Sequence, residues 1–199
     1  MSDRDRPILC ATDFSNSGER ALDLAIAAGR ALGRSLVLAH VMDTGRAADE
    51  HAPRATAEAD RVLHERVQAR VSEAQRALER EARRATGTAI ETALLDGRPW
   101  EAIVAHASAI DASCIVIGAH GTSDPVRLVR DEALGWLLGS TADRVVRASP
   151  CPVLVGTRDG EIVSLEGARW IVGVALDGAS KHALEAALQL AERARAHLE

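Results

Sequence analysis

Residues 7–12 read Pro-Ile-Leu-Cys-Ala-Thr, and residues 13–17, which follow directly, read Asp-Phe-Ser-Asn-Ser. The first stretch is short, apolar and bounded by turn-forming residues, which predicts a buried strand. The second is rich in residues that cap helices, and apolar residues then recur at helical spacing up to Leu32, where Gly33 can close the helix. Residues 35–42 form the next apolar run. A strand, a helix and a strand in this order favour a parallel sheet.

The chain keeps the same alternation as far as residue 156. The run over residues 113–117 is apolar from Cys114 onward, as expected for a strand that is buried on both faces. Pro99 stands at a favourable first helical position, after a turn. The sequence therefore predicts an α/β fold. The further strands are expected over residues 90–95, 113–117 and 152–155, and the further helices over residues 59–84, 100–109 and 132–148.

The longest expected helix has a narrow apolar stripe, and its charged residues lie off that line. Such a stripe can pack on a face of the sheet or pair with another helix in a coiled coil. Because the stripe is short and only weakly apolar, packing on the sheet is the favoured interpretation. Its members are Leu63, Val67, Val71, Ala74 and Leu78.

Composition argues against several classes of partner. The 199 residues carry a formal net charge of -5 and their arginines are scattered, so the basic patch needed to bind a nucleic-acid duplex is missing. Aromatic residues make up 2% of the chain, too few for the stacking platforms of single-strand binders. No apolar run approaches the ~18–20 residues of a membrane span, and the charged N-terminus lacks the apolar core of a signal peptide. We expect neither nucleic acid nor membrane as a partner.

The three cysteines, Cys10, Cys114 and Cys151, are far apart and lie in or beside apolar runs. This pattern indicates reduced, structural thiols and a cytoplasmic protein. Neither the cysteines nor the histidines show the spacing of metal ligands, and no Ser-His-Asp or Cys-His set is visible. We expect no metal site and assign no catalytic residue.

Residues suited to a ligand follow several of the predicted strands. In an open parallel sheet, ligands bind beyond the carboxyl ends of the strands, where the strand order reverses. Asp13, next to Thr12, can accept hydrogen bonds from a ribose or an adenine, although an aspartate there can also cap a helix. The turn from Gly118 to Gly121 can present its backbone N–H groups to an anion, although such turns also occur without a ligand. The other candidates are Val41 near the second strand end, His120, which can touch a phosphate or simply fill a turn position, and the small residues Gly139, Ser140 and Thr141.

Five stretches within residues 7–156 carry a resemblance to a known family. They are residues 8–15 (Ile-Leu-Cys-Ala-Thr-Asp-Phe-Ser), 39–41 (Ala-His-Val), 115–121 (Ile-Val-Ile-Gly-Ala-His-Gly), 139–146 (Gly-Ser-Thr-Ala-Asp-Arg-Val-Val) and 149–155 (Ser-Pro-Cys-Pro-Val-Leu-Val). Together they resemble the opening strand, the second strand end, the phosphate turn and the closing helix and strand of the universal stress protein family.

The resemblance implies a doubly wound, open, Rossmann-like sheet of five parallel strands, similar to the adenine-nucleotide α-hydrolases. It also implies homodimers, commonly formed through the last strand. In the ATP-binding branch of the family, the aspartate and the valine hold adenine and ribose, and a Gly-x2-Gly-x9-Gly-Ser/Thr pattern holds the phosphates. ATP with Mg²⁺ is therefore the implied cofactor. The implied contacts are Thr12, Asp13, Val41, Gly118, His120, Gly121, Gly139, Ser140 and Thr141.

The chain departs from that pattern between Gly121 and Gly139. Residues 122–138 form a connection eight residues longer than the pattern allows. In one interpretation the insert bulges outward, the two glycine turns still meet, and ATP binds with Arg127 or Arg130 at a phosphate. In the other, the insert places carboxylates near the phosphates, and an unpaired like charge there costs ~1–3 kcal/mol of binding free energy. The sequence leaves both open, with binding favoured.

The end of the chain repeats its beginning. An apolar strand expected over residues 170–176 ends at Asp177, as the first strand ends at Asp13, and a helix expected over residues 180–198 matches the first helix in register. A lone strand and helix cannot bury their own apolar surface. They can pack on the first domain, pair with another chain or begin a second domain, and the repeat favours the start of a tandem copy. The expected division is a domain over residues 1–156, a linker over 157–168 and a partial repeat over 169–199.

Three functions are compatible with these patterns. The favoured one is a stress-response module that binds ATP or a related adenine nucleotide and acts through its conformation or its partners. The alternative is a nucleotide-free, dimeric interaction scaffold, which the insert and the incomplete repeat favour. The third and weakest is a slow ATPase, which would need only a positioned water and Mg²⁺.

Overall fold

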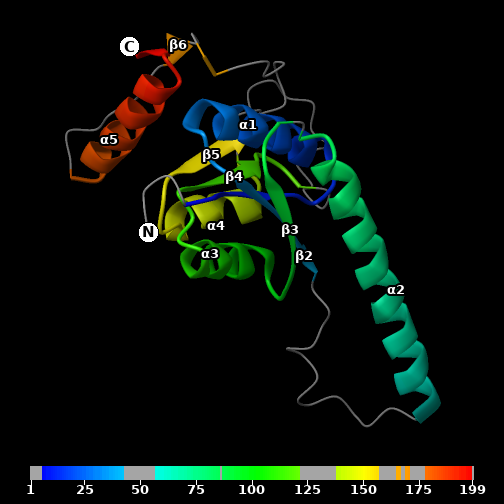
Figure 1. Ribbon diagram of the computed structural model, residues 1–199. Helices are drawn as coiled ribbons and strands as arrows, with labels where there is room; N and C mark the ends of the chain where they lie inside the picture. Colours follow the sequence, from blue (N-terminus) through cyan, green and yellow to red (C-terminus); the bar gives the residue numbers. More distant parts are fainter. Residues whose placement is uncertain are drawn as a thin grey trace, which may run out of the picture.

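A computed structural model of the chain describes residues 6–42, 57–85, 87–121, 138–156, 165–166, 169–170 and 178–198. Five parallel strands form one sheet in the order β3-β2-β1-β4-β5 (Figure 1). The strand order reverses beside β1, as in a doubly wound fold, so the expected α/β architecture is confirmed. The strands are β1 (Ile8–Ala11), β2 (Leu36–Met42), β3 (Ile90–Asp96), β4 (Cys114–Gly118) and β5 (Val153–Gly156).

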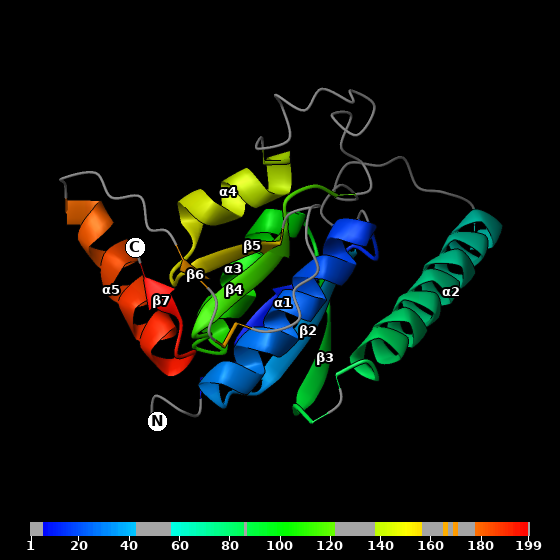
Figure 2. The same ribbon diagram turned by 90° about the horizontal axis from the view of Figure 1, so that it is seen from above.

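Helices cover both faces of the sheet. Helices α1 and α2 lie on one face, and α3 and α4 lie on the other (Figure 2). Because both faces are covered, β1 and the first four residues of β4 are fully buried, which explains why these strands are apolar throughout. The four helices are α1 (Asn16–Leu32), α2 (Ala57–Ala82), α3 (Pro99–Ala109) and α4 (Ser140–Ala148).

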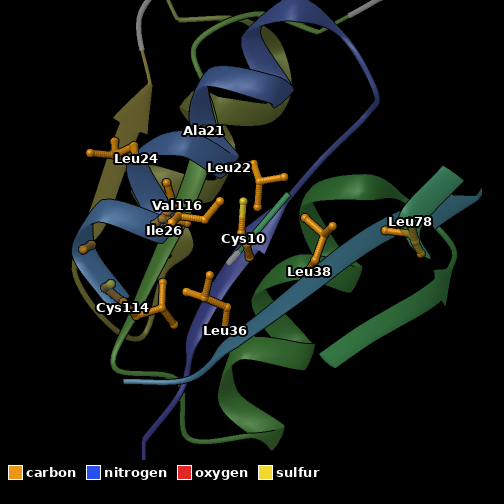
Figure 3. Packing of buried hydrophobic residues seen from close by; sticks show 14 residues of the cluster. Cys10, Ala21, Leu22, Leu24, Ile26, Leu36, Leu38, Leu78, Cys114 and Val116 are labelled. Atoms are coloured by element: carbon orange, nitrogen blue, oxygen red, sulfur yellow. The ribbon is translucent and has the colours of Figure 1, made fainter. Parts of the chain in front are cut away.

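The core beneath α1 is built from aliphatic and small side chains. Cys10, Leu38 and Val116 project from three neighbouring strands toward Ala21 and Leu22 of α1 (Figure 3). All five side chains are completely shielded from solvent. Alanines along α1 allow the helix to lie close to the sheet, so the chain forms a dense core almost without aromatic residues.

The ends of α1 are set by residues that the sequence singled out. Ser15 is the N-cap, and its hydroxyl oxygen accepts a hydrogen bond of 3.1 Å from the Gly18 N–H. Gly33 adopts the left-handed conformation at φ 63°, which glycine enters without steric cost. The following N–H, of Arg34, bonds back to the Gly29 carbonyl at 2.9 Å and completes a Schellman closure.

The apolar stripe of α2 packs on the sheet only in part. Ala74 and Leu78 are buried, whereas Leu63 is 56% exposed and Val62 is 36% exposed. The prediction that the whole stripe packs on the sheet is therefore wrong for its amino-terminal half. The physical reason is length, because α2 extends past the edge of the sheet (Figures 1 and 2). A residue beyond that edge has no strand beneath it.

The predicted partial repeat, residues 169–199, is described only in part. Strand β6 (Arg169–Trp170) pairs in parallel with β7 (His197–Leu198), and α5 (Gly178–Arg193) lies between them in the chain. The rest of the expected strand over residues 171–176 lies outside the described residues. Leu165, within the expected linker, packs against the core beneath α1.

The helix predicted over residues 180–198 ends earlier in the structure, at Arg193. Arg195 adopts a left-handed conformation at φ 49°, and the Ala196 N–H bonds back to the Ala191 carbonyl at 2.8 Å. This is a Schellman closure without glycine, so the sequence carries no obvious stop signal. The last residues therefore form β7 instead of helix.

The three cysteines are free thiols. Burial raises the pKa of Cys114 to about 12 and raises the pKa of Cys10 further, and burial also raises the pKa of Cys151. Thiols that resist ionisation are poor nucleophiles, in agreement with a structural role. Among the helices of the described residues, none is both long enough and apolar enough to cross a membrane.

Candidate functional site

The candidate residues lie where the strand order reverses. Strand β1 pairs with β2 on one side and with β4 on the other, and all three run in the same direction. The loop after β1 and the turn after β4 therefore leave the same edge of the sheet. The carboxyl edge at this point is the usual ligand site of open α/β sheets. Asp13 follows β1, and Gly118 ends β4.

Asp13 occupies a turn between β1 and α1. Its Oδ1 atom accepts a hydrogen bond of 3.1 Å from the Ser15 N–H, so the side chain helps to order the start of α1. Asp13 is only half-buried. The two interpretations of this residue, as a cap and as a ligand contact, are therefore compatible, because one oxygen atom orders the turn while the carboxylate stays accessible.

Two glycines of the β4 turn lie very close to groups of the first loop and of α1. A Cβ atom at Gly118 would lie 2.8 Å from the backbone of Ser17 in α1, and a Cβ at Gly121 would lie 2.9 Å from Oδ2 of Asp13. Real Cβ atoms essentially never approach another heavy atom so closely. The β4 turn and the Asp13 turn therefore lie against one another.

The beginning of α4 meets the same turn. The Gly139 N–H donates a hydrogen bond of 2.8 Å to the Ala119 carbonyl oxygen. The Ala119 N–H in turn donates a hydrogen bond of 2.9 Å to the carbonyl oxygen of Gly156, at the end of β5. The two ends of the interrupted glycine pattern are thus adjacent in space. The course of the insert itself lies outside the described residues.

Helix α4 presents its amino-terminal end at this place. Gly139 is its N-cap and has no side chain with which to cap the helix. Ser140 is exposed and Thr141 is half-exposed in the first turn. Backbone N–H groups and the helix dipole favour an anion at such an end, and two hydroxyl groups add further donors.

The remaining predicted residues are less central. Val41 faces the core beneath α3 and α4, where its side chain is partly buried. His120 is half-buried within the β4 turn. Within the described ranges, no three His, Cys, Asp or Glu side chains gather as metal ligands.

The structure adds Phe14 and His40, which were not among the predicted site residues, beside Thr12, which was. The Thr12 hydroxyl accepts a hydrogen bond of 3.0 Å from the Phe14 N–H. The backbone carbonyl oxygen of Thr12 is hydrogen-bonded to His40 Nδ1 at 2.8 Å. The Phe14 and His40 rings face one another with their centroids 4.4 Å apart. Phe14 itself has φ 60°, which is unusual for a residue other than glycine. The signal in the sequence was the aromatic residue inside an otherwise polar turn.

The profile of the Universal stress protein family matches residues 6–156. The chain belongs to the universal stress protein family. A curated universal stress protein of Thermus aquaticus, named for its place in the QAH/OAS sulfhydrylase 3′ region, is 35% identical over 152 residues, which cover 75% of this chain and 97% of the relative.

Solved structures of the family have the same fold. The universal stress protein UspA of Lactobacillus plantarum is 28% identical with a TM-score of 0.60, and the match covers 78% of this chain and 99% of that one. The universal stress protein of Archaeoglobus fulgidus in complex with dAMP is 25% identical with a TM-score of 0.51, covering 76% and 98% of the two chains. The match to the family profile ends at residue 156, before residues 169–199.

Proposed function

We propose that this universal stress protein binds ATP or a related adenine nucleotide at the carboxyl edge of its sheet. Occupancy of the site would alter its conformation or its affinity for a partner rather than support rapid turnover. The observation that carries the proposal is the hydrogen bond between Gly139 and Ala119, because it brings the two halves of the interrupted phosphate pattern together. The solved Archaeoglobus fulgidus relative, which holds dAMP, supports an adenine nucleotide as the ligand class.

Each part of the proposed site has its own role. Asp13 would accept hydrogen bonds from the ribose, with Val41 beside the adenine. The N–H groups of the β4 turn and of the first turn of α4 would bind the phosphates, with Ser140 and Thr141 adding hydroxyl donors. Mg²⁺ would neutralise part of the phosphate charge.

Equilibrium binding tests this function. Titration calorimetry with Mg-ATP should give saturable binding to the wild-type chain, and Asp13→Ala should lower the affinity about 10- to 100-fold, since hydrogen bonds to a charged group contribute ~1.5–3 kcal/mol. Asp13→Asn keeps an oxygen acceptor for the Ser15 N–H and separates loss of charge from loss of the turn. Absence of wild-type binding, together with no bound nucleotide after native purification, would overturn the proposal.

A dimer is the second part of the proposal. Strand β5 lies at the edge of the sheet, and an edge strand can pair with another chain through its unpaired backbone groups. We propose a homodimer formed at this edge, in the cytoplasm. Sedimentation at several concentrations would test it, with a monomer at every concentration as the contrary result.

A nucleotide-free scaffold remains the second candidate. It is favoured by the exposed apolar residues Val62 and Leu63 on the amino-terminal half of α2. In that case Mg-ATP would cause no thermal shift, and removing these two side chains would weaken association without changing stability. Slow ATP hydrolysis is tested separately, by phosphate release above the buffer blank.

A further inference from the structure

His40 stands near the carboxyl end of β2, on the face of the sheet that α1 and α2 cover. Leu38, two residues earlier, projects into the core beneath α1 (Figure 3), and alternate residues of a strand share a face. Val41, the next residue, packs on the opposite face, beneath α3 and α4. The His40 ring is half-buried. It therefore reaches the carboxyl edge of the sheet from the face opposite to Val41.

Both backbone groups of Thr12 are bonded to β2. Its N–H donates a hydrogen bond of 2.9 Å to the Ala39 carbonyl oxygen. Its carbonyl oxygen lies 2.8 Å from Nδ1 of His40. Because a carbonyl oxygen can only accept, the proton of this second bond belongs to the ring, and Nδ1 is the donor. In the neutral ring of His40 the proton is therefore on Nδ1, and Nε2 carries none.

Phe14 lies against the same ring. The centroids of the Phe14 and His40 rings are 4.4 Å apart, and the ring planes are inclined by 33°. The Phe14 backbone has φ 60°, a left-handed conformation that is disfavoured for a residue with a Cβ atom. Such a conformation persists where surrounding contacts hold it. The His40 ring supplies one of these contacts, and the hydrogen bond from the Phe14 N–H to the Thr12 hydroxyl supplies another.

Asp13 lies between the two residues that His40 contacts. Thr12 precedes it and is hydrogen-bonded to His40, and Phe14 follows it and lies against the His40 ring. The Asp13 carboxylate accepts the Ser15 N–H at 3.1 Å through Oδ1, and its Oδ2 atom lies against the β4 turn. A side chain takes its direction from the backbone that carries it. His40 therefore holds the backbone from which the Asp13 carboxylate reaches the β4 turn.

We propose that His40 is a positioning residue for Asp13. Its Nδ1–H holds the Thr12 carbonyl group and its ring holds Phe14, so the backbone is fixed on both sides of the carboxylate. The role requires no contact between His40 and a ligand. The part that concerns nucleotide affinity rests on the proposed function. The part that concerns the turn does not, and it is measurable without any nucleotide.

The first measurement needs no variant of the turn. Nuclear magnetic resonance of the ring nitrogens in the full-length chain, in mildly alkaline buffer, should show the His40 proton on Nδ1 and not on Nε2. The ring of His64, exposed on α2, is the reference within the same molecule and should show no such preference for Nδ1. A neutral His40 ring with its proton on Nε2 would overturn the proposal.

Three variants separate the donor from the ring. His40→Leu removes both, His40→Phe keeps an aromatic ring, and His40→Asn keeps an N–H donor the same number of bonds from the backbone. The Ser15 amide reports the position of the Asp13 carboxylate, to which it is hydrogen-bonded. Its hydrogen exchange should become at least ~3-fold faster in His40→Leu. His40→Phe and His40→Asn should each recover part of that change, because each keeps one of the two contacts.

A double-mutant cycle separates positioning from general stability. With Mg-ATP as the probe, His40→Leu should lower the affinity ~3- to 10-fold in the wild-type chain. In the Asp13→Ala chain the same change should lower it less than ~1.5-fold, because the carboxylate that His40 positions is absent. A merely structural role would give the same loss in both chains. His64→Leu, at an exposed position of α2, is the matched control and should leave the affinity unchanged.

The outcomes separate the two proposals. If His40→Leu leaves the Ser15 amide as His64→Leu does, or if its effect on affinity is equally large without the Asp13 carboxylate, the positioning role is overturned. Should His40→Leu fail to fold, the His40 tautomer and the two partial variants decide the same question. A wild-type chain that binds no nucleotide would overturn the proposed function, while the tautomer and the Ser15 amide still decide the role of His40 in the turn.

Discussion

The Gly139 N–H lies 2.8 Å from the carbonyl oxygen of Ala119 and donates a hydrogen bond to it. This contact joins the start of α4 to the turn after β4, across the insert that interrupts the glycine pattern. The eight additional residues therefore do not separate the two ends of the proposed phosphate site. The geometry around this contact and the packing behind it lead to five further predictions.

Gly121→Ala should weaken nucleotide binding with little loss of stability. The new Cβ atom would lie 2.9 Å from Oδ2 of Asp13, so that side chain must turn away from its present position. We expect Mg-ATP affinity to fall ~10-fold in calorimetry, comparable to one lost hydrogen bond to a charged group. A variant with wild-type affinity would contradict the assigned role of Asp13.

Gly118→Ala, in contrast to Gly121→Ala, should lower the stability of the fold itself. Its Cβ atom would lie 2.8 Å from the Ser17 backbone, which cannot move without shifting α1. We expect a loss of ~1–3 kcal/mol in the free energy of unfolding, as in other overpacked cores. Thermal or urea denaturation of both variants separates damage to the site from damage to the fold.

The double variant Ser140→Ala/Thr141→Ala should discriminate between parts of the nucleotide. Both hydroxyls lie in the first turn of α4, where the phosphates are proposed to bind. ATP affinity should fall ~3- to 10-fold while adenosine affinity changes less than ~2-fold. Ser108→Ala, at an exposed position of α3, is the control. Equal losses for ATP and adenosine would place these hydroxyls away from the phosphates.

Leu78→Ala and Leu63→Ala compare the two halves of α2. Leu78 is 1% exposed and Leu63 is 56% exposed. The first change should cost ~2–5 kcal/mol of unfolding free energy and the second less than ~0.5 kcal/mol, as measured in urea. A large, concentration-dependent cost for Leu63→Ala would instead show that its surface is buried between two chains.

Alkaline pH should destabilise the protein through its buried thiols. The pKa of Cys114 is about 12 in the folded chain, against an ordinary value of 9.0. Its contribution to stability is complete below pH 9 and is lost as pH rises toward 12, because the unfolded chain gives up the proton first. Unfolding free energy should therefore fall by up to ~1.4 kcal/mol per pH unit for this group. Cys114→Ala should lower the overall stability but flatten that slope, and an unchanged slope would contradict this assignment.

The sheet could be predicted from the chain because its strands are local signals. Each is a short apolar run bounded by turn residues. Because both faces of the sheet are covered, the strands are almost continuously apolar and lack the alternation of apolar and polar residues found in half-exposed strands. Gly33 and Pro99 marked helix ends correctly for the same reason, since each acts through its own backbone. The places of Asp13, Gly118 and Gly139 at strand and helix ends could also be predicted, because each belongs to a local turn or cap pattern.

Two predictions were wrong, the burial of the amino-terminal half of the α2 stripe and the end of α5, because neither is set by the local sequence pattern. The stripe of α2 gives no indication of where the sheet ends, so Leu63 was wrongly expected to be covered. The end of α5 at Arg193 is made by a left-handed Arg195, and arginine is not a usual residue for that conformation. Neither outcome could be derived from periodicity alone.

The sequence by itself determined the α/β class, the positions of the five strands and the residues at their carboxyl ends, because these follow from hydrophobic period and turn chemistry. Only the tertiary structure decided that Gly139 meets Ala119 and that Asp13 lies against Gly121. The members of each pair are distant in the chain, and Asp13 meets Gly121 because β1 and β4 are neighbours in the sheet. That arrangement is fixed by the packing of all the elements together, which no single stretch encodes.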